Sequence, residues 1–179
     1  RRLVWAAGAT LSALVLEPLV AELRGTTWPQ RKGRNLDAQH YLVLGVPAAG
    51  VAPKPLHRYE RLWQLACEAL WSLAPDFTPT SIAITSNFRG SPHVDVGDRT
   101  PQYVLSCGDF RGHSGPHGGE LCVEASPTEL VCVDTHDRLA CVDGRFIHWV
   151  TPYEGERFSV VFYRLEGPLE PVERAVHEV

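Results

Sequence analysis

The chain has 179 residues, of which 44% are hydrophobic and 21% are charged, and its formal net charge is −4. This size and composition are typical of a single globular domain with a buried core, so we expect residues 1–179 to form one domain. The acidic balance argues against a protein that binds nucleic acid by charge alone, because phosphates need a basic surface. The absence of methionine indicates a domain excised from a longer protein.

The first segment predicts a helix over residues 9–23. Its leucines recur at helical spacing, and Pro18 predicts a kink or break within it. Glu17, Pro18 and Glu22 interrupt the apolar run, so it is too short to span a membrane and is expected to be buried. The basic segment Arg24–Arg34 that follows contains Gly, Pro and Thr, which favour a solvated loop over a binding patch.

The next segment completes a helical N-terminal support, expected over residues 1–76. Residues 41–46 form a short apolar run that predicts a strand or a buried connector, and residues 47–55 predict a loop with three prolines. Residues 57–73 give the clearest helical pattern, with an apolar stripe opposite charged residues, and Pro75 ends it. Such a stripe is typical of a packing face.

From Phe77 onward the pattern becomes that of short strands. Gly, Pro and Asp residues separate the apolar runs, and no helical pattern lies between them, so the strands must pair antiparallel as a sandwich or barrel over residues 77–165. Residues 166–179 form a charged tail, expected as a short terminal element or frayed end. The expected strands are 81–85, 102–107, 120–124, 129–133, 145–149 and 157–164.

The cysteine pattern bears on the cellular compartment. An odd number of cysteines without a Cys-x-x-Cys pair predicts buried free thiols rather than disulfides or a zinc site. We therefore expect an intracellular protein, in the nucleus or cytoplasm, where the environment is reducing. The cysteines are Cys67, Cys107, Cys122, Cys132 and Cys141.

His93-Val94-Asp95 is the first group that suggests metal chemistry. Residues two apart in an extended strand point to the same face, so this imidazole and this carboxylate converge. A His-x-Asp pair is common by chance. A second histidine would complete the two-histidine, one-carboxylate set that leaves open positions on non-haem iron(II).

The best second histidine is His148. It lies within an expected strand, whereas the alternatives lie in a glycine-rich loop (His113, His117) or in a polar turn (His136). A lone histidine among apolar residues is more often a core residue, so the residues downstream decide its interpretation.

Those residues are Arg157 and Ser159, which share one face of the last expected strand. A buried arginine is costly unless it is paired, and no acid shares that face. Guanidinium plus hydroxyl is a good binding site for a ligand carboxylate. The alternative is a salt bridge to Glu154, Glu156 or an acid on another strand.

With these residues assembled, the pattern His148-x-Val150-x-Pro152-x-x-x-x-Arg157-x-Ser159, together with His93-x-Asp95, resembles the Fe(II)/2-oxoglutarate-dependent oxygenases. The resemblance covers residues 80–165, and the spacing of nine from His148 to Arg157 is similar to that of the prolyl-hydroxylase branch. It implies a mainly β fold with flanking α structure: a double-stranded β-helix, or jelly roll, with the N-terminal helices packed on one sheet.

The same resemblance implies roles for individual residues. His93, Asp95 and His148 would bind the iron and form the catalytic centre. Arg157 and Ser159 would bind the distal carboxylate of 2-oxoglutarate, with Tyr103 as a further hydrogen-bond donor. Two residues before the metal-binding strand are expected to face the co-substrate or substrate: Asn87 and Arg89.

The implied reaction is hydroxylation or oxidation of a substrate C–H bond with release of succinate and CO2. The cofactors are Fe(II), 2-oxoglutarate and O2, with ascorbate as a reductant. The glycine-rich segment Gly108–Gly119 is either a lid over the site or a long hairpin loop.

The substrate stays open at this point. The segments Asn87–Asp95 and Val142–Trp149 are similar to a protist and algal subgroup related to the TET and J-binding-protein hydroxylases, which implies a modified nucleobase in DNA or RNA. A peptide or a small molecule is the alternative substrate. A jelly-roll binding module without turnover is the alternative from another class, and a zinc hydrolase comes last because it leaves Arg157 and Ser159 unexplained.

Overall fold

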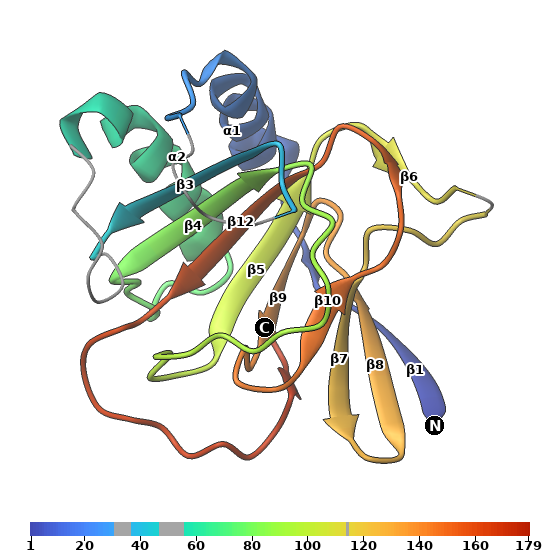
Figure 1. The fold of residues 1–179 in the computed structure, drawn as a ribbon. Helices are drawn as coiled ribbons and strands as arrows, with labels where there is room; N and C mark the ends of the chain where they lie inside the picture. The colour runs from blue at the N-terminus through green and yellow to red at the C-terminus, as the bar shows by residue number, and fades with distance from the viewer. Residues whose placement is uncertain (31–36, 47–55, 114) are drawn as a thin grey trace.

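Two β-sheets face each other in the computed structural model, which describes residues 1–30, 37–46, 56–113 and 115–179 (Figure 1). The larger sheet has the strand order β13-β9-β5-β12-β4-β3, with β2 also paired to β9, and the smaller has the order β1-β8-β7-β10. The larger sheet contains β2 (Ala9–Thr10), β3 (His40–Gly45), β4 (Ser81–Ser86), β5 (Gln102–Cys107), β9 (Arg138–Val142), β12 (Phe158–Tyr163) and β13 (Val176–His177). The smaller contains β1 (Arg2–Ala7), β7 (Leu121–Ser126), β8 (Glu129–Asp134) and β10 (His148–Val150).

Strand β12 lies at the centre of the larger sheet, between β4 and β5. Its residues alternate between the two faces of the sheet, as the period of two requires. Phe158, Val160 and Phe162 are buried in the core on the outer face. The opposite face of the strand turns toward the smaller sheet and forms part of the wall of a cavity described below. The strand therefore reads as an almost continuous hydrophobic run because both of its faces are covered.

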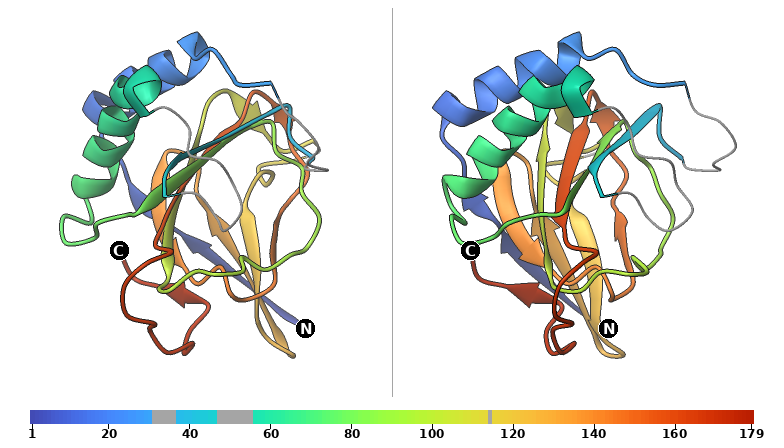
Figure 2. Two further views of the ribbon diagram at one scale, coloured as in Figure 1. Left: turned by 60° about the vertical axis from the view of Figure 1, so that its left-hand side comes forward. Right: turned by 90° about the vertical axis from the view of Figure 1, so that its left-hand side faces the viewer.

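Helices α1 (Ala13–Gly25) and α2 (Glu60–Trp71) pack together on one side of the larger sheet (Figure 2). The Ser12 side chain caps α1 by accepting a hydrogen bond from the Leu14 N–H at 3.2 Å. Pro18 lies inside α1, in its second turn, and the helix continues through it. A short 3-10 turn, η1 (Leu56–Tyr59), leads into α2. The prediction of a mainly β fold with N-terminal helices packed on one sheet is confirmed.

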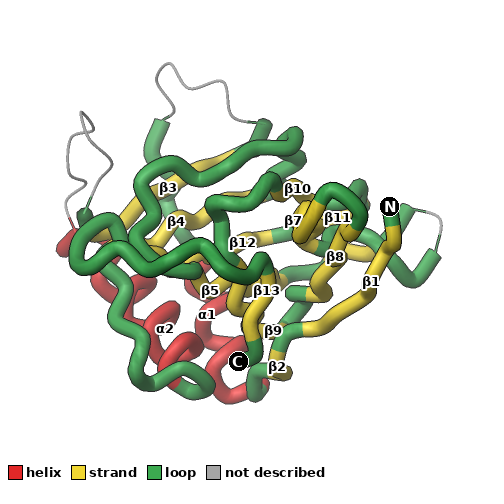
Figure 3. The backbone as a smooth tube through the Cα atoms, turned by 90° about the horizontal axis from the view of Figure 1, so that it is seen from below, coloured by secondary structure: helices red, strands yellow, loops and turns green. Residues whose placement is uncertain are grey.

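Residues 1–76 also contain strands that the sequence pattern did not predict. Strand β1 pairs in parallel with β8, so not every strand pair is antiparallel. Strand β9 was missed as well, and so were the two-residue strands β6 (Phe110–Arg111) and β11 (Glu154–Gly155), which pair with each other. Figure 3 shows that the tail returns to the sheet, where β13 pairs with β9. Partners distant in sequence decide whether these strands form.

The expectation of five free thiols is wrong, because Cys122 and Cys132 form a disulfide between adjacent strands β7 and β8. The cysteines are ten residues apart, and only the register of the hairpin places them opposite each other. Cys67, Cys107 and Cys141 are free and buried. The argument for a reducing compartment depended on free thiols and loses its basis.

Two sequence-based expectations lie wholly or partly outside the described residues: the loop at 47–55 and the second half of the basic segment Arg24–Arg34. Among the helices that the structure describes, none has the length and apolar character needed to cross a membrane.

Candidate metal centre and co-substrate pocket

His93 and His148 lie side by side because their backbones pair. The His93 N–H donates to the His148 carbonyl at 3.0 Å, and the His148 N–H donates to the His93 carbonyl at 2.9 Å. Strand β10 is in turn paired with β7, which fixes His148 in the smaller sheet. The Asp95 N–H donates to the Gly144 carbonyl at 2.8 Å. Backbone pairing thus brings the His93–Asp95 pair next to His148, which lies 55 residues after His93 in the sequence.

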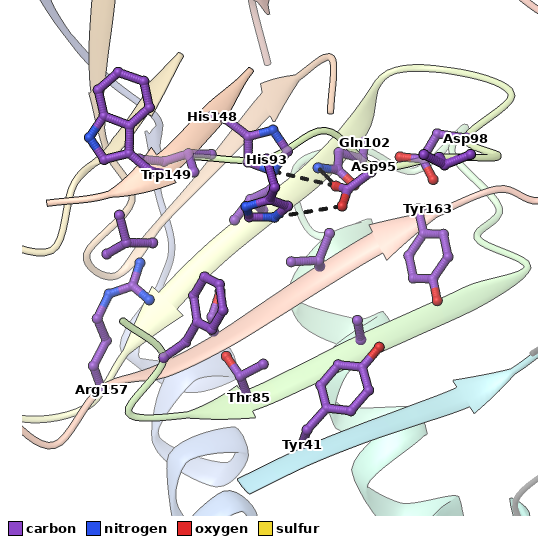
Figure 4. Close-up of a pocket in the computed structure, with 18 of the residues that line it drawn as sticks. Tyr41, Thr85, His93, Asp95, Asp98, Gln102, His148, Trp149, Arg157 and Tyr163 are labelled. Carbon is purple, nitrogen blue, oxygen red and sulfur yellow. Dashed lines mark hydrogen bonds and ion pairs between the residues drawn. The ribbon is translucent and has the colours of Figure 1, made fainter. Parts of the chain in front are cut away.

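One nitrogen or oxygen atom from each of His93, Asp95 and His148 lies within 4.8 Å of the others (Figure 4). Asp95 Oδ1 is 3.8 Å from His93 Nε2, and Asp95 Oδ2 is 3.5 Å from His148 Nε2. Both histidine Nδ1 atoms lie 2.9 Å from backbone carbonyls, those of Ser91 and Phe146. A carbonyl only accepts, so each Nδ1 carries a proton, which leaves Nε2 as the atom that can bind a metal beside the carboxylate.

The electrostatics of the centre agree with metal ligation. Burial lowers the pKa of His148, and this effect outweighs the neighbouring Asp95 carboxylate. A neutral imidazole is the form that binds a metal. Two neutral imidazoles and one carboxylate are the donor set suited to Fe(II), so these residues fit the metal that the sequence pattern implied.

Gln102 on β5 holds the Asp95 carboxylate in place. Its Nε2 donates to Asp95 Oδ2 at 3.0 Å, and the Gln102 side chain is buried. A Cβ on Gly144 would lie 2.5 Å from Gln102 Nε2 and 2.7 Å from Asp95 Oδ2. Glycine is therefore required there, because any larger residue would displace both groups.

We predict that Gln102→Leu weakens binding of Mn(II), used as a redox-stable probe, by about tenfold or more, because a ligand that loses its outer hydrogen bond is less well oriented. Isothermal titration calorimetry measures the affinity. Gln64→Leu, an exposed glutamine on α2, is the matched control and should bind as the original chain does. Equal affinities for the two variants would contradict a positioning role for Gln102.

Arg157 lies just before β12 and is completely buried, with 0% of its surface exposed. Its Nη2 donates to the Gly119 carbonyl at 3.0 Å, while Nε and Nη1 have no hydrogen-bond partner among the described residues. The rings of Phe110 and Tyr153 lie 5.4 and 5.5 Å from the guanidinium carbon. Burial lowers the pKa of Arg157 to about 10.

The proposed salt bridges to Arg157 do not form. Glu156 pairs with Arg24 at 2.7 Å, and Glu154 contacts His113. Unpaired donors on a buried cation are unusual, and they indicate that an anion binds here.

Two hydroxyl groups accompany Arg157 on the wall of the cavity. Ser159 and Thr85 lie opposite each other on β12 and β4, and both line the cavity. Thr85 Oγ1 is buried without a hydrogen-bond partner among the described residues. Arg157, Ser159 and Thr85, which we call the carboxylate-binding cluster, combine one cation with two hydroxyls, as a bound carboxylate requires.

The cavity joins the metal centre to this cluster. It has a volume of about 340 Å³ and lies between the inner faces of the two sheets. Figure 4 shows Arg157 and Thr85 on one side of it, the metal-centre residues across from them, and Tyr163 and Asp98 at the far end. Apolar side chains fill the wall between these groups: Ala83, Val104, Leu121, Val150 and Val161.

Asp98 is a polar group at the far end of the cavity that the sequence pattern did not reveal. It is 5% exposed, and its Oδ2 has no hydrogen-bond partner among the described residues. Burial raises the pKa of Asp98 to about 7, with a further contribution from the Asp95 and Asp143 carboxylates. Asp98 comes from the loop after the His-x-Asp pair, where no periodicity signals its burial.

Three of the site residues expected from the sequence do not line the cavity. Tyr103 lies on the outer face of β5 and packs edge-on against Phe77, with ring centroids 4.9 Å apart. Side chains alternate between the two faces of a strand, and its neighbour Val104 faces the cavity, so the Tyr103 side chain points to the opposite face. Arg89 is exposed and lies 5.8 Å from the Tyr153 ring. Asn87 bonds to the Arg157 backbone instead.

The glycine-rich segment Gly108–Gly119 is not a lid in this structure, since none of its described residues lines the cavity. Its short strand β6 pairs with β11, and Phe110 packs beneath Arg157. Two of the alternative histidines have other partners: His136 contacts the Gly108 carbonyl at 3.0 Å, and His113 contacts Glu154.

Comparison with known proteins reveals a similarity of fold. No protein-family model and no curated protein matches the sequence. The solved structure of NgTET1 in complex with 5mC DNA matches 89% of this chain and 70% of its own, with a TM-score of 0.59 and 16% identity. A 2OG-Fe(II) oxygenase family oxidoreductase from Burkholderia pseudomallei matches 80% of this chain and 76% of its own, with a TM-score of 0.56 and 16% identity.

At 16% identity, both matches show a similarity of fold alone. In this chain the three candidate metal ligands and the buried arginine line one cavity. The chain has the fold of the 2-oxoglutarate/Fe(II) oxygenase superfamily.

Proposed function

We propose that this chain is an Fe(II)- and 2-oxoglutarate-dependent oxygenase that oxidises a substrate C–H bond and releases succinate and CO2. The observation that carries the proposal is the pairing of two features in one cavity. His93, Asp95 and His148 offer a metal-binding set, and Arg157, which is buried with two nitrogens unbonded among the described residues, faces the same cavity. A zinc hydrolase would explain the first feature but not the second.

Each group has a distinct task in this reaction. His93, Asp95 and His148 would hold Fe(II), which supplies the redox chemistry that activates O2 for C–H oxidation. The carboxylate-binding cluster holds the distal carboxylate of 2-oxoglutarate, with Arg157 Nε and Nη1 as donors. The apolar wall excludes water from the reacting groups.

Two measurements test the class. Calorimetry should show one Mn(II) bound per chain, and 2-oxoglutarate should bind only when the metal is present. With Fe(II), O2 and ascorbate, the chain should then form succinate slowly even without a substrate. A chain that binds neither metal nor 2-oxoglutarate would be a binding module without turnover, which would overturn the proposal.

For the substrate, we infer a modified nucleobase in DNA or RNA. Two observations support it: the fold similarity to NgTET1, whose structure contains 5mC DNA, and Asp98 at the far end of the cavity, whose Oδ2 has no partner among the described residues. A base edge presents N–H groups that such a carboxyl accepts. Succinate formation against methylated DNA and RNA oligonucleotides, compared with peptides, tests this. Stimulation by peptides alone would reject the nucleobase.

Asp98 also predicts a pH effect on the metal-free protein. Burial raises the pKa of this carboxyl to about 7, so the folded chain keeps a proton that the unfolded chain releases near pH 4. The stability that protonated Asp98 contributes to the folded chain is therefore present at low pH and is lost as the pH rises through 7. Asp98→Asn, which cannot ionise, should melt above the original chain by on the order of 5 °C at pH 8.

Thermal unfolding at pH 5 and pH 8 measures this effect. The difference between Asp98→Asn and the original chain should be larger at pH 8. Asp76→Asn changes an exposed carboxylate and serves as the control. A difference that stays constant between the two pH values would show that Asp98 is not held in a protonating environment.

A further inference from the structure

Asn87 occupies an unusual position at the end of β4. Its φ angle is +52°, one of two positive values among the described non-glycine residues, the other being that of Asp137 at +55°. Asparagine tolerates this left-handed conformation better than most residues. The regular pairing of β4 with β12 ends one residue earlier, at Ser86 and Phe158.

Beyond that point, Asn87 continues the ladder with its side chain. Its backbone N–H donates to the Arg157 carbonyl at 2.7 Å, as in a normal strand pair. The Arg157 N–H, however, donates to the Asn87 side-chain Oδ1 at 2.9 Å rather than to a backbone carbonyl. The left-handed turn redirects the chain, and the side-chain amide replaces the backbone acceptor.

The orientation of this amide is fixed from the other side. Asn87 Nδ2 donates to Gln39 Oε1 at 2.8 Å, which directs Oδ1 toward Arg157. Gln39 is itself held, because its N–H donates to the Ser86 carbonyl at 2.9 Å. Three backbone segments therefore converge on the one peptide that carries the buried guanidinium.

Arg157 depends on such a fixed backbone more than an ordinary strand residue does. Its charge is fully buried, and no carboxylate among the described residues orients it. The Gly119 carbonyl and two aromatic rings hold the guanidinium, and the backbone sets where the side chain begins. Bidentate binding of a carboxylate tolerates little displacement of the planar donor group.

We propose that Asn87 is a positioning residue for 2-oxoglutarate binding, acting through the Arg157 backbone rather than by touching substrate. The inference rests on the proposed function. It assigns Asn87 a role in co-substrate affinity that is separate from metal binding and from the chemical step. It also accounts for an asparagine at this point, because the residue must both adopt a positive φ angle and accept the Arg157 N–H.

The decisive variant is Asn87→Gly, which keeps the backbone conformation available and removes the side-chain amide, both the acceptor for the Arg157 N–H and the donor to Gln39. We expect the Kd and the KM for 2-oxoglutarate to rise about tenfold, since a partly buried N–H loses its acceptor beside the binding group. The kcat at saturating 2-oxoglutarate and the affinity for Mn(II) should not change. Calorimetry with Mn(II) present measures the Kd without turnover.

Asp137→Gly is the matched control, because it also places glycine at a left-handed position but lies outside the cavity lining. It should leave the Kd for 2-oxoglutarate unchanged. If Asn87→Gly binds 2-oxoglutarate as tightly as this control, the positioning role is wrong. A fall in kcat with an unchanged KM would also overturn it, because that pattern belongs to a residue that contacts substrate.

A second measurement needs no variant. The Arg157 amide proton of the original chain, followed by NMR hydrogen exchange, should be protected in the absence of 2-oxoglutarate, because Asn87 holds it. Rapid exchange would overturn the proposal even if Asn87→Gly failed to fold. If the original chain bound no 2-oxoglutarate with Mn(II) present, the proposed function itself would fail, which is a different outcome from equal binding by the two glycine variants.

Discussion

Replacing His93, Asp95 or His148 with alanine is expected to lower the affinity for Mn(II) by more than about 100-fold and to abolish succinate formation. Each side chain supplies one of the three ligand atoms within 4.8 Å, and the described residues offer no other group of three. Losing a ligand is more severe than losing an outer hydrogen bond, which itself costs about 10–100-fold. Calorimetry and a succinate assay measure the two effects.

A matched control separates loss of the site from loss of a histidine in general. His113→Ala removes an exposed histidine that contacts Glu154 outside the cavity, so metal affinity and turnover should persist. Circular dichroism should show that all four variants keep the native strand content. Metal affinity that survives both His93→Ala and Asp95→Ala would refute the metal centre.

Arg157→Met is expected to have two opposite effects. The KM for 2-oxoglutarate should rise by about 100-fold or more, since removing a buried charged partner of a carboxylate costs about 2–5 kcal/mol. The metal-free protein should become more stable, because the variant no longer buries a cation without a counter-ion. The lowered pKa of Arg157 has the same cause, since burial disfavours the charged form.

A succinate assay at varied 2-oxoglutarate concentrations measures the KM, and thermal unfolding of the metal-free chain measures the stability. Arg138→Met is the control. Arg138 is also partly shielded from solvent, but unlike Arg157 it pairs with an acid, Asp134, and it hydrogen-bonds to Thr10. It should leave the KM unchanged and should not raise the melting temperature. If Arg157→Met bound 2-oxoglutarate normally, the cavity would have to bind a different co-substrate.

Several parts of the site could be predicted from local sequence because local geometry decides them. His93 and Asp95 are two residues apart in an extended segment, and Arg157 and Ser159 share a strand face for the same reason. Tyr103 was suggested by the family resemblance instead, and it lies on the outer face of β5, away from the cavity. A period of two defines two faces but does not say which one the cavity lies on.

Other parts depended on contacts between distant segments. Gln102 meets Asp95 through the packing of β5 against the His-x-Asp loop, and Thr85 meets Ser159 through strand register. The Cys122–Cys132 disulfide depends on hairpin register in the same way. Asn87 reaches the Arg157 backbone only because β4 and β12 are neighbours in the larger sheet.

The sequence alone determined the type of fold and the types of group in the site, because hydrophobic periodicity and motif spacing are properties of the local chain. Only the tertiary structure decided which groups meet. It placed His148 against His93 by pairing their backbones, and it buried Arg157 with two of its nitrogens unbonded among the described residues. Burial and unmet hydrogen bonds are properties of the whole packed molecule, and they turn a strand arginine into a binding site for a carboxylate.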